Sequence, residues 1–369
     1  MAVTTITEED TEQIAALSGR IFMAGLEALE LLNVEVGLRL GLYNVLAERG
    51  ASTAEELATA AGIAERYARE WLEQQAVSGV LTANHTADAS SRRFALPPAH
   101  AHVLLDADSP ANTTALAAFI AECGRMLPAL VDAFRSGGGV PYADYAIHDL
   151  QAAFTRPVFA NNLLQDWLPA LPDIHGRLIA GESLRIAEIG CGEGVASITI
   201  ARAFPHVVVH GYDLDEASIA AARKNAAEAG VADRARFELS DASKGAAAIA
   251  GDAKYDLVFA VEMLHDVPDP VGVLTTMREL RSDSGAVLVA DERVADEFTA
   301  PGDEMERFMY AASVLHCLPV GLVEPGSAAT GTVIRSSIVR DYAARAGFAD
   351  TTVLTVEHPQ FRLYRLETA

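Results

Sequence analysis

A glycine-rich segment in the second half of the chain is the first feature whose residue types suit ligand binding. The apolar run Leu184–Ile189 ends in Gly190-Cys191-Gly192-Glu193-Gly194, and a helical pattern begins at Ala196. Glycines at a strand-to-helix turn let the backbone approach a ligand closely, and the start of a helix leaves N–H groups free. Dinucleotide sites use a similar turn, but their fingerprint needs Gly or Ala where this chain has Val195. The pattern here is G-x-G-x-G.

Two carboxylates follow at the ends of the next two apolar runs. Asp213 stands 23 residues after Gly190, where a carboxylate can accept hydrogen bonds from both hydroxyls of a ribose. Ser240-Asp241-Ala242 closes the other run, and a carboxylate there can accept from the amino group of an adenine. The alternative role for Asp213 is to cap the helix that follows, a role that Asp215 suits better.

The elements that must position these residues alternate between strands and helices. Such alternation predicts a parallel sheet with helices on both faces, in which successive strands end at one edge and a ligand binds there. Two further strands, separated only by a four-residue turn, predict an antiparallel hairpin at the carboxyl end. The expected strands are 184–189, 207–212, 235–239, 255–261, 286–290, 350–356 and 361–366, and the expected helices are 196–203, 217–229, 271–280 and 338–346.

The first hundred residues predict a separate helical domain. Leucines between Leu26 and Leu40 have helical spacing, and Ser52 with Glu55 has the spacing of a capping box for a helix that runs to Gly62. A third helix is expected over Glu65–Val77, followed by a short hairpin over 81–86 and 92–96. This order is typical of a winged helix. We place the domain boundaries at 1–110 for this domain, 111–177 for a helical linker and 178–369 for the sheet domain.

Charge argues against nucleic acid as a partner. The formal net charge is -23, and residues 1–100 hold 7 Arg, no Lys and 14 Asp or Glu. Proteins that bind DNA need a basic footprint, so the winged helix is expected to serve packing or dimerisation rather than DNA contact. The same field repels anionic membrane surfaces, but it does not repel a cationic ligand.

Cysteine usage and the apolar pattern bear on metal content and location. Cys123, Cys191 and Cys317 are scattered and lack metal-ligand spacing, so no metal site is expected. The segment Met1–Asp10 has no secretory pattern, and no uncharged apolar run approaches the ~20 residues of a membrane helix. We therefore expect a cytoplasmic protein.

On these motifs the chain from about Leu184 to the end resembles the class I S-adenosylmethionine-dependent methyltransferases. With its amino-terminal half it resembles bacterial members that carry a winged-helix dimerisation domain, and more distantly the plant-type small-molecule O-methyltransferases. The resemblance implies a Rossmann-like, seven-stranded, doubly wound α/β sheet with a C-terminal hairpin. It also implies S-adenosyl-L-methionine as methyl donor, S-adenosyl-L-homocysteine as product, a small-molecule acceptor, and a homodimer formed through the N-terminal domain.

The resemblance also assigns the cofactor site. The turn would line the methionine and ribose portion through Glu188, Gly190, Cys191, Gly192 and Gly194. Asp213 would hold the ribose hydroxyls and Leu214 would lie against the adenine, whose edge would face Ser240, Asp241 and Ala242. Val261 and Glu262, at the end of the fourth strand, would lie beside the methyl donor.

The same family supplies a candidate base. Its O-methyltransferases carry a Leu-His-Asp-Trp-like segment after the fourth strand, and this chain has Leu264-His265-Asp266-Val267 there. A neutral imidazole has an ordinary pKa of about 6.5 and can take the proton of a hydroxyl as its oxygen attacks the methyl group. Val267 departs from the Trp of the pattern. The alternative is therefore open that His265 only packs against the next helix or touches the cofactor. His316 is a second candidate base.

These observations predict methyl transfer to a small, fairly apolar molecule, at a hydroxyl oxygen in preference to nitrogen or carbon. The chain lacks the Asn- or Asp-Pro-Pro-aromatic segment of adenine and cytosine N-methyltransferases after the fourth strand. The alternatives are a winged-helix regulator that binds S-adenosylmethionine without catalysis, and a partner-bound pseudoenzyme.

Overall fold

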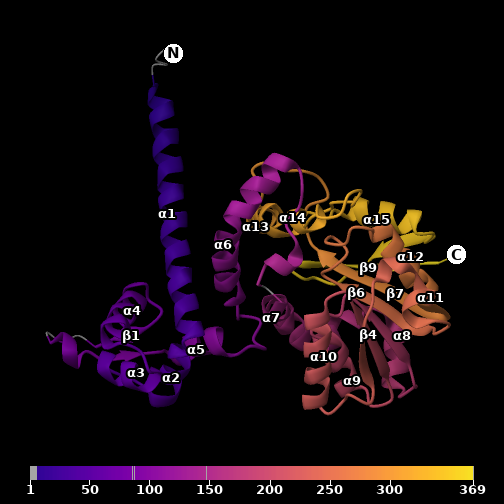
Figure 1. The fold of residues 1–369 in the computed structure, drawn as a ribbon, viewed down its shortest axis with the longest axis horizontal. Helices are drawn as coiled ribbons and strands as arrows, with labels where there is room; N and C mark the ends of the chain where they lie inside the picture. Colours follow the sequence, from indigo (N-terminus) through magenta and orange to yellow (C-terminus); the bar gives the residue numbers. More distant parts are fainter. Residues whose placement is uncertain (1–5, 85, 87, 147, 369) are drawn as a thin grey trace. The chain divides into compact units, whose positions relative to one another are not determined.

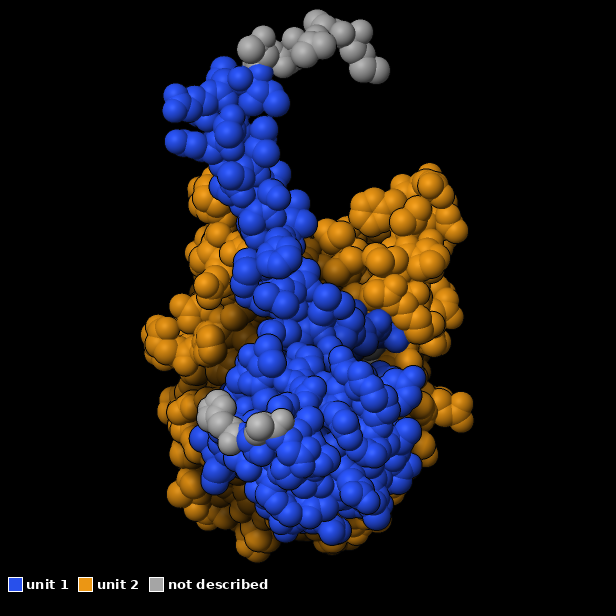
Figure 2. Space-filling view, turned by 90° about the vertical axis from the view of Figure 1, so that its left-hand side faces the viewer, with its two compact units in different colours: residues 1–122 blue, residues 123–369 orange. Residues whose placement is uncertain are grey.

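The computed structural model describes residues 6–84, 86, 88–146 and 148–368. The chain divides into two compact units, Met1–Glu122 and Cys123–Ala369, which Figure 2 distinguishes by colour. Within the described residues no helix combines the length and the apolar character that crossing a membrane requires.

The first unit is the predicted helical domain with a small hairpin (Figure 1). Its core is formed by apolar side chains of the short helices and the hairpin, among them Leu46, Leu57, Leu72 and Phe94. The elements are α1 Glu8–Arg39, α2 Leu42–Arg49, α3 Ala54–Ala61, α4 Glu65–Val77, β1 Thr82–Ala83, η1 Ala89–Ser91, β2 Phe94–Ala95 and α5 Pro98–Leu105. The helix-helix-helix-hairpin order confirms the winged-helix prediction.

The capping box of α3 lies one residue later than the sequence spacing suggests. Thr53 is the N-cap: its hydroxyl accepts from the Glu56 N–H at 3.2 Å, and the Glu56 carboxylate accepts from the Thr53 N–H at 2.9 Å. Ser52 is held elsewhere, because its backbone exchanges two hydrogen bonds of 2.9 Å with Phe94. The assignment to Ser52 and Glu55 is therefore wrong, and the backbone bridge is the reason.

Helix α1 is much longer than the leucine pattern indicates. It spans 32 residues and begins with its own capping box between Thr7 and Asp10. Along it runs a stripe of exposed apolar side chains at helical intervals of three, four or eight residues, which we call the α1 stripe: Ile14, Leu17, Ile21, Leu29, Leu32 and Val36. Ile21 is 64% exposed. A lone surface helix normally turns such a face to a core, so the α1 stripe lacks a partner within the described chain.

The second unit is built on one seven-stranded sheet, whose strands run in the order β5-β4-β3-β6-β7-β9-β8. The pairs from β5 to β7 are parallel, and β9 pairs antiparallel with both β7 and β8. This confirms the doubly wound sheet with a C-terminal hairpin. The strands are β3 Arg185–Ile189, β4 Val208–Asp213, β5 Ala235–Leu239, β6 Tyr255–Val261, β7 Arg281–Glu292, β8 Asp350–Val353 and β9 Phe361–Glu367.

Alternate side chains of the central strands pack into two hydrophobic cores, one on each face of the sheet. Ile186 and Phe259 belong to one core, and their neighbours Ala187 and Val258 belong to the other. This period of two is what a strand with two covered faces requires. The helices after the glycine turn are α9 Val195–Ala203, α10 Glu216–Glu228, α11 Ala246–Ala250, α12 Pro270–Leu280 and α15 Ser336–Arg345, with η4 Ala242–Lys244.

The strand order reverses beside β3, because the chain passes from β3 to β4 and β5 on one side and returns to β6 on the other. In parallel sheets the crevice beyond the carboxyl ends of the strands at such a point receives the ligand. The carboxyl ends of β3, β4, β5 and β6 carry the predicted cofactor residues. The topology therefore positions the predicted site at the edge where such sheets bind ligands.

Further helices lie before the sheet and after β7. The first group is α6 Ala115–Ser136, which crosses the boundary between the units, η2 Tyr142–Asp144, α7 His148–Val158, η3 Phe159–Trp167 and α8 Pro172–Ile179. The second group is α13 Glu304–Ala312, η5 Ser313–Cys317 and α14 Leu318–Gly321. Trp167 is fully buried against Phe159 and Phe361, so at least part of the aromatic content of the first group is core.

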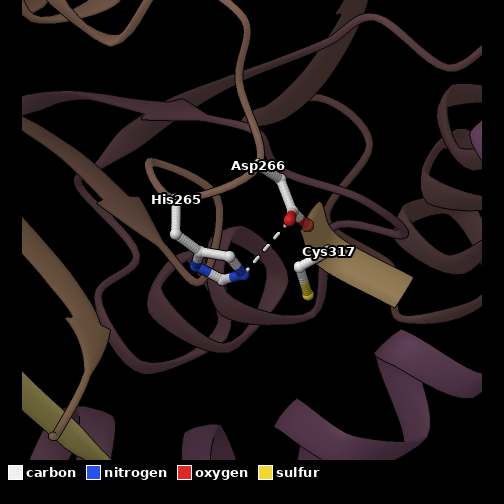
Figure 3. Close-up of side chains that lie close together, drawn as sticks. All are labelled: His265, Asp266 and Cys317. Carbon is white, nitrogen blue, oxygen red and sulfur yellow. Dashed lines mark ion pairs between the residues drawn. The ribbon is translucent and has the colours of Figure 1, made fainter. Parts of the chain in front are cut away.

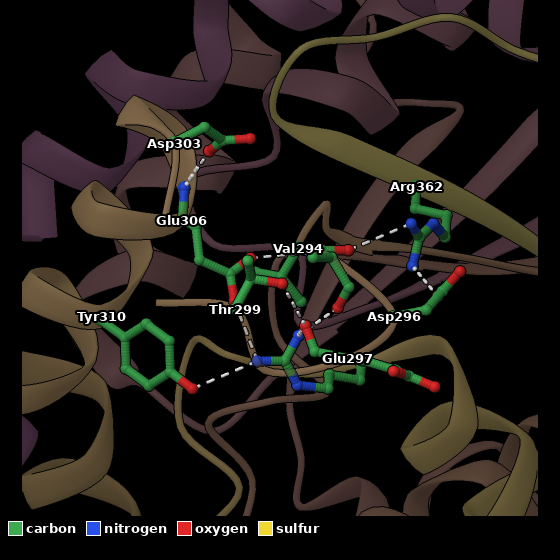
Figure 4. Close-up of polar contacts among 10 residues, drawn as sticks. Val294, Asp296, Glu297, Thr299, Asp303, Glu306, Tyr310 and Arg362 are labelled. Carbon is green, nitrogen blue, oxygen red and sulfur yellow. Dashed lines mark hydrogen bonds and ion pairs between the residues drawn. The ribbon is translucent and has the colours of Figure 1, made fainter. Parts of the chain in front are cut away.

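Figure 4 shows polar contacts around Glu306, in the segment after β7. One of the contacts of Glu306 is an ion pair with Arg335. Arg335, at the start of α15, donates to the Glu306 carboxylate at 2.9 Å and to the Tyr310 hydroxyl at 3.2 Å. The second Glu306 oxygen accepts from the Ala295 N–H at 2.8 Å, and Glu306 is only 4% exposed. Because α13 continues directly into η5, this ion pair also fixes the place of η5.

Candidate active site

The three glycines of the turn have left-handed backbones for different local reasons. Their φ angles are 71° at Gly190, 49° at Gly192 and 77° at Gly194. A Cβ on Gly190 would lie 2.9 Å from Met263, and one on Gly194 would lie 2.5 Å from the ring of Phe237. A Cβ on Gly192 would meet nothing within 4 Å. Gly192 therefore faces open space, where a ligand can approach the backbone.

Asp213 lies directly beside Gly192. One oxygen of its carboxylate accepts from the Gly192 N–H at 2.8 Å, and the other accepts from the Asp215 N–H at 2.9 Å. Burial raises the pKa of Asp213, against the lowering effect of these hydrogen bonds. Asp215 is the N-cap of α10 and accepts from the Ser218 N–H at 2.7 Å. Asp213 is thus left for another role, because the cap is already supplied.

Leu214 is 69% exposed next to Asp213, which is unusual for so large an apolar side chain at the end of a buried strand. The backbone of β5 continues alongside, with the Ser240 N–H donating to the Asp213 carbonyl at 2.8 Å. Asp241 caps η4 through Ser243, at 2.9 Å from its N–H and 2.6 Å from its hydroxyl. Burial alone would raise the pKa of Asp241, but these bonds and Lys244 hold it below its ordinary value.

Asp241 therefore has a structural task that the sequence argument did not assign, and Ala242 packs partly against a core of the sheet. Both nevertheless lie at the carboxyl end of the strand beside β4. The structure joins Gly192 and Asp213 by a direct hydrogen bond and Asp213 to Ser240 through the backbone.

Glu188 and Cys191 lie beneath the turn. Glu188 is 2% exposed, and its carboxylate accepts from both the N–H and the hydroxyl of Ser197 in α9. Burial raises the pKa of Glu188 to about 8. Cys191 is also buried, and its thiol has a pKa raised first by burial and then by the charges of Glu188 and Asp213. A reactive thiol needs the opposite shift, so Cys191 is expected to act by packing.

Glu262, directly after Val261 at the end of β6, has a strained backbone. Its φ is 52°, in the left-handed region that only glycine adopts without strain, and its N–H donates to Ala290 of β7 at 2.9 Å. Burial raises the pKa of the Glu262 carboxyl to about 8. Strain of this kind gathers at functional sites, where the surroundings hold it in place.

His265 follows in the same loop and is 2% exposed. Its Nδ1 lies 2.6 Å from the Asp291 carboxylate at the end of β7, and its Nε2 lies 3.4 Å from Asp266. Asp291 is in turn held by the N–H groups of Leu264 at 3.0 Å and Glu292 at 2.9 Å. The Asp291 bond fixes the ring so that Nδ1 carries a proton and Nε2 is the atom available to other groups.

Two opposing effects act on the His265 ring. Burial would lower its pKa, but the charges of Asp266 and Asp291 together raise it well above the ordinary value. The ring is therefore a strong proton acceptor once it is neutral.

His316 lies in η5 and has a different environment. Its ring is packed by Tyr145, with centroids 4.7 Å apart and planes at 84°, and by Tyr142 at 6.1 Å. Burial lowers the pKa of His316 and so favours the neutral form of this ring. Its Nδ1 is 3.4 Å from the sulfur of Cys317. The π-helical turn that carries both residues is a local feature often found at functional sites.

Tyr142 is affected by acidic residues of both the glycine turn and the His265 loop. Burial is the main cause of its raised pKa, and the charges of Asp213, Asp215 and Asp266 add to it. Its ring therefore lies within electrostatic reach of both the turn and the His265 loop. Neither Tyr142 nor Asp291 is among the site residues predicted from the sequence. The signal that could have found Asp291 is an acid at the end of an apolar strand, the same signal that identified Asp213.

Comparisons with known proteins agree with this architecture. Residues 181–330 match the family described as Methyltransferase domain, and residues 28–105 match the Rv2258c-like winged HTH domain. A ubiquinone biosynthesis O-methyltransferase of Paracidovorax citrulli is 33% identical over 140 residues, which is 38% of this chain and 53% of that protein. Its counterpart in Aromatoleum aromaticum is 27% identical over 56% of this chain and 79% of its own length. The chain thus spans about half of the first relative.

Solved structures resemble nearly the whole chain. The mitomycin 7-O-methyltransferase MmcR has a TM-score of 0.69 at 20% identity, covering 97% of this chain and all of its own. The O-methyltransferase NcsB1 from neocarzinostatin biosynthesis, solved with S-adenosyl-L-homocysteine and 1,4-dihydroxy-2-naphthoic acid, has a TM-score of 0.61 at 18% identity, covering 92% and 96%. At these identities the likeness concerns the fold. Residues 28–105 thus match a winged-helix domain and residues 181–330 match a methyltransferase domain, in a chain whose fold resembles that of solved O-methyltransferases.

Proposed function

We propose that this protein transfers a methyl group from S-adenosyl-L-methionine to a hydroxyl oxygen of a small, fairly apolar molecule. The observation that carries the proposal is the direct contact between Gly192, which faces open space, and the carboxylate of Asp213. Matching relatives named as O-methyltransferases support oxygen as the accepting atom. The NcsB1 complex with a dihydroxynaphthoic acid supports a hydroxylated aromatic acceptor.

The residues at the edge of the sheet fit an adenosine-linked donor. Asp213 offers an acceptor for ribose hydroxyls, and the exposed Leu214 offers an apolar surface for a base. The open space at Gly192 admits the ligand to the backbone, and Glu188 lies beneath the same turn. The bound donor supplies a methyl group on a positively charged sulfur, which any nearby nucleophilic oxygen can attack.

His265 is the proposed base. Asp291 holds its Nδ1 proton, so Nε2 is positioned to accept the proton of the acceptor hydroxyl. Asp291 acts here as a positioning residue, because it fixes the ring and its tautomer. His316, neutral and enclosed by Tyr142 and Tyr145, is proposed to form part of the acceptor wall. Inline displacement needs little further assistance beyond orientation and the exclusion of water.

Isothermal titration with S-adenosyl-L-homocysteine tests the donor site. Asp213→Asn should weaken binding about tenfold to a hundredfold, the loss expected when charged hydrogen bonds are removed. Asp233→Asn is the control, since that carboxylate is exposed outside the edge of the sheet. Equal affinity of Asp213→Asn and the wild type would refute the donor site.

A methyl-transfer assay against a panel of phenols and naphthols, read as S-adenosyl-L-homocysteine release, tests the reaction. His265→Gln should slow turnover by about 10²–10⁴-fold, the usual contribution of a general base, with the donor affinity unchanged. Undiminished turnover would remove His265 from the reaction and leave His316 as the candidate base.

The described winged helix does not support a DNA-binding regulator. Helix α4 takes the place of a recognition helix, yet its Arg66 and Arg69 are paired with Glu70 and Glu65 on the same helix. Such internal pairs leave no basic footprint on that face. We propose instead that the first unit mediates homodimerisation through the α1 stripe, because water-exposed apolar faces of this length are normally covered by a partner.

A further inference from the structure

The side chains around Nε2 of His265 form a mixed donor set. One potential ligand atom each from His265, Asp266 and Cys317 lies within 4.8 Å of the other two. Figure 3 shows the Asp266 carboxylate and the Cys317 sulfur on the same side of the ring, near one of its nitrogens. His265 and Cys317 are buried and Asp266 is half-buried. Imidazole nitrogen, carboxylate oxygen and thiolate sulfur are the three ligand types that Zn²⁺ takes in proteins.

The spacing suits a tetrahedral ion. Metal–ligand bonds of about 2.0–2.3 Å place neighbouring ligand atoms roughly 3.3–3.8 Å apart around tetrahedral zinc. The distance from His265 Nε2 to Asp266 Oδ1 is 3.4 Å, which falls in that range without any movement. The sulfur needs only a small adjustment, since no pair in the set is more than 4.8 Å apart.

The outer partner of His265 also matches a metal site. A histidine that binds a metal through one nitrogen usually donates its other N–H to a carboxylate, which orients the ring. Asp291 takes this place at 2.6 Å from Nδ1, and it is itself held by the N–H groups of Leu264 and Glu292. The orientation of His265 is therefore fixed by Asp291, which is not itself one of the three ligand residues.

We propose that His265, Asp266 and Cys317 bind Zn²⁺ as a three-ligand site with an open fourth position. Binding displaces the thiol proton of Cys317 and the Nε2 proton of the charged His265 ring to the solvent, and the metal takes the lone pair that is left on Nε2. The consequence for catalysis rests on the proposed function: a ring that holds zinc cannot accept the proton of an acceptor hydroxyl. Zn²⁺ is then a reversible inhibitor of methyl transfer, and chelation restores activity.

Direct metal binding is the first test, and it requires neither donor nor acceptor. Metal-free protein titrated with zinc chloride should take up one ion, and Cys317→Ser should weaken binding about tenfold or more. Cys123→Ser is the matched control, because Cys123 is a buried cysteine outside the cluster. Circular dichroism and S-adenosyl-L-homocysteine affinity report whether each variant is folded.

Cobalt substitution tests the ligand set in the wild-type protein, so it does not depend on a variant that folds. Co²⁺ bound to the cluster should show a thiolate-to-metal charge-transfer band and the intense visible bands of a tetrahedral site. Absence of zinc binding, a Co²⁺ spectrum without the thiolate band, or equal zinc affinity in Cys317→Ser and the wild type would each overturn the inference.

The outcomes separate this inference from the proposed function. Zinc binding without methyl transfer to any acceptor would leave the metal site standing and count against the enzyme. Methyl transfer that zinc leaves unchanged in the wild type would support the enzyme and contradict inhibition through His265. Inhibition of the wild type that is weakened in Cys317→Ser is the result we expect.

Discussion

Replacing two glycines of the same turn by alanine should separate ligand binding from folding. Gly192 and Gly194 both have positive φ angles, 49° and 77°, so an alanine at either position costs about 1–2 kcal/mol in backbone strain. At Gly194 the new Cβ would also lie 2.5 Å from the Phe237 ring, which must move. Overpacking of a core adds about 1–3 kcal/mol, so Gly194→Ala should lower the free energy of unfolding by about 2–5 kcal/mol in total.

Gly192→Ala should behave differently, because its Cβ meets nothing within 4 Å. Its unfolding free energy should fall only by the strain of about 1–2 kcal/mol, but the methyl group would occupy the space through which a donor reaches the backbone. We expect at least a tenfold loss of S-adenosyl-L-homocysteine affinity, equivalent to about 1.4 kcal/mol. Urea unfolding and isothermal titration measure the two quantities on both variants. Wild-type affinity in Gly192→Ala would refute the assignment of the turn, and wild-type stability in Gly194→Ala would refute the packing argument.

Three further predictions concern other parts of the chain. Burial raises the pKa of Glu188 to about 8 from an ordinary 4.5, so its contribution to stability is complete below pH 4.5 and is lost as the pH rises through 8. Urea unfolding should show the wild type losing up to about 5 kcal/mol relative to Glu188→Gln between these limits, and parallel pH profiles would contradict the shift. Arg335→Met should lower the unfolding free energy by about 3 kcal/mol because it leaves the buried Glu306 charge unpaired, whereas Arg345→Met, which breaks an exposed pair on the same helix, should change it by under about 1 kcal/mol. Ile21→Glu, in the middle of the α1 stripe, should convert a dimer to a monomer in sedimentation equilibrium with an unchanged circular dichroism spectrum; a dimer that persists would place the interface elsewhere.

The sheet could be predicted closely because its signals are local. The expected strands 235–239 and 255–261 coincide with β5 and β6, since each is an apolar run bounded by polar residues. The start of β7 was missed by five residues, because Arg281 to Gly285 are mostly polar and Arg281 pairs with Tyr255 across an irregularity in the register. Pairing through a bulge depends on the neighbouring strand, and no local pattern contains that information.

Helix α1 shows a second limit of the same kind. The expected helix rests on the leucines between Leu26 and Leu40, so it omits the first half of α1, whose first turn is acidic and whose apolar side chains are exposed. We propose a second copy of the chain as the partner of this face, and the sequence of one copy carries no local signal for such a contact.

The choice between the two histidines shows most clearly what sequence reasoning lacked. The segment Leu264-His265-Asp266 favours His265 over His316 as the proposed base, but it does not show what orients the ring. A carboxylate 26 residues away along the chain does so, because the pairing of β6 with β7 brings Asp291 to within 2.6 Å of His265. His316 is buried against aromatic rings, and burial disfavours its charged form, the state that a base must reach after taking a proton, more than the charge of Asp266 favours it. A base needs stabilisation of its protonated state as well as a free lone pair. In the described structure, contacts with Asp291 and Asp266 supply this stabilisation to His265, so the pairing of two strands adds support for the proposed base that the sequence does not contain.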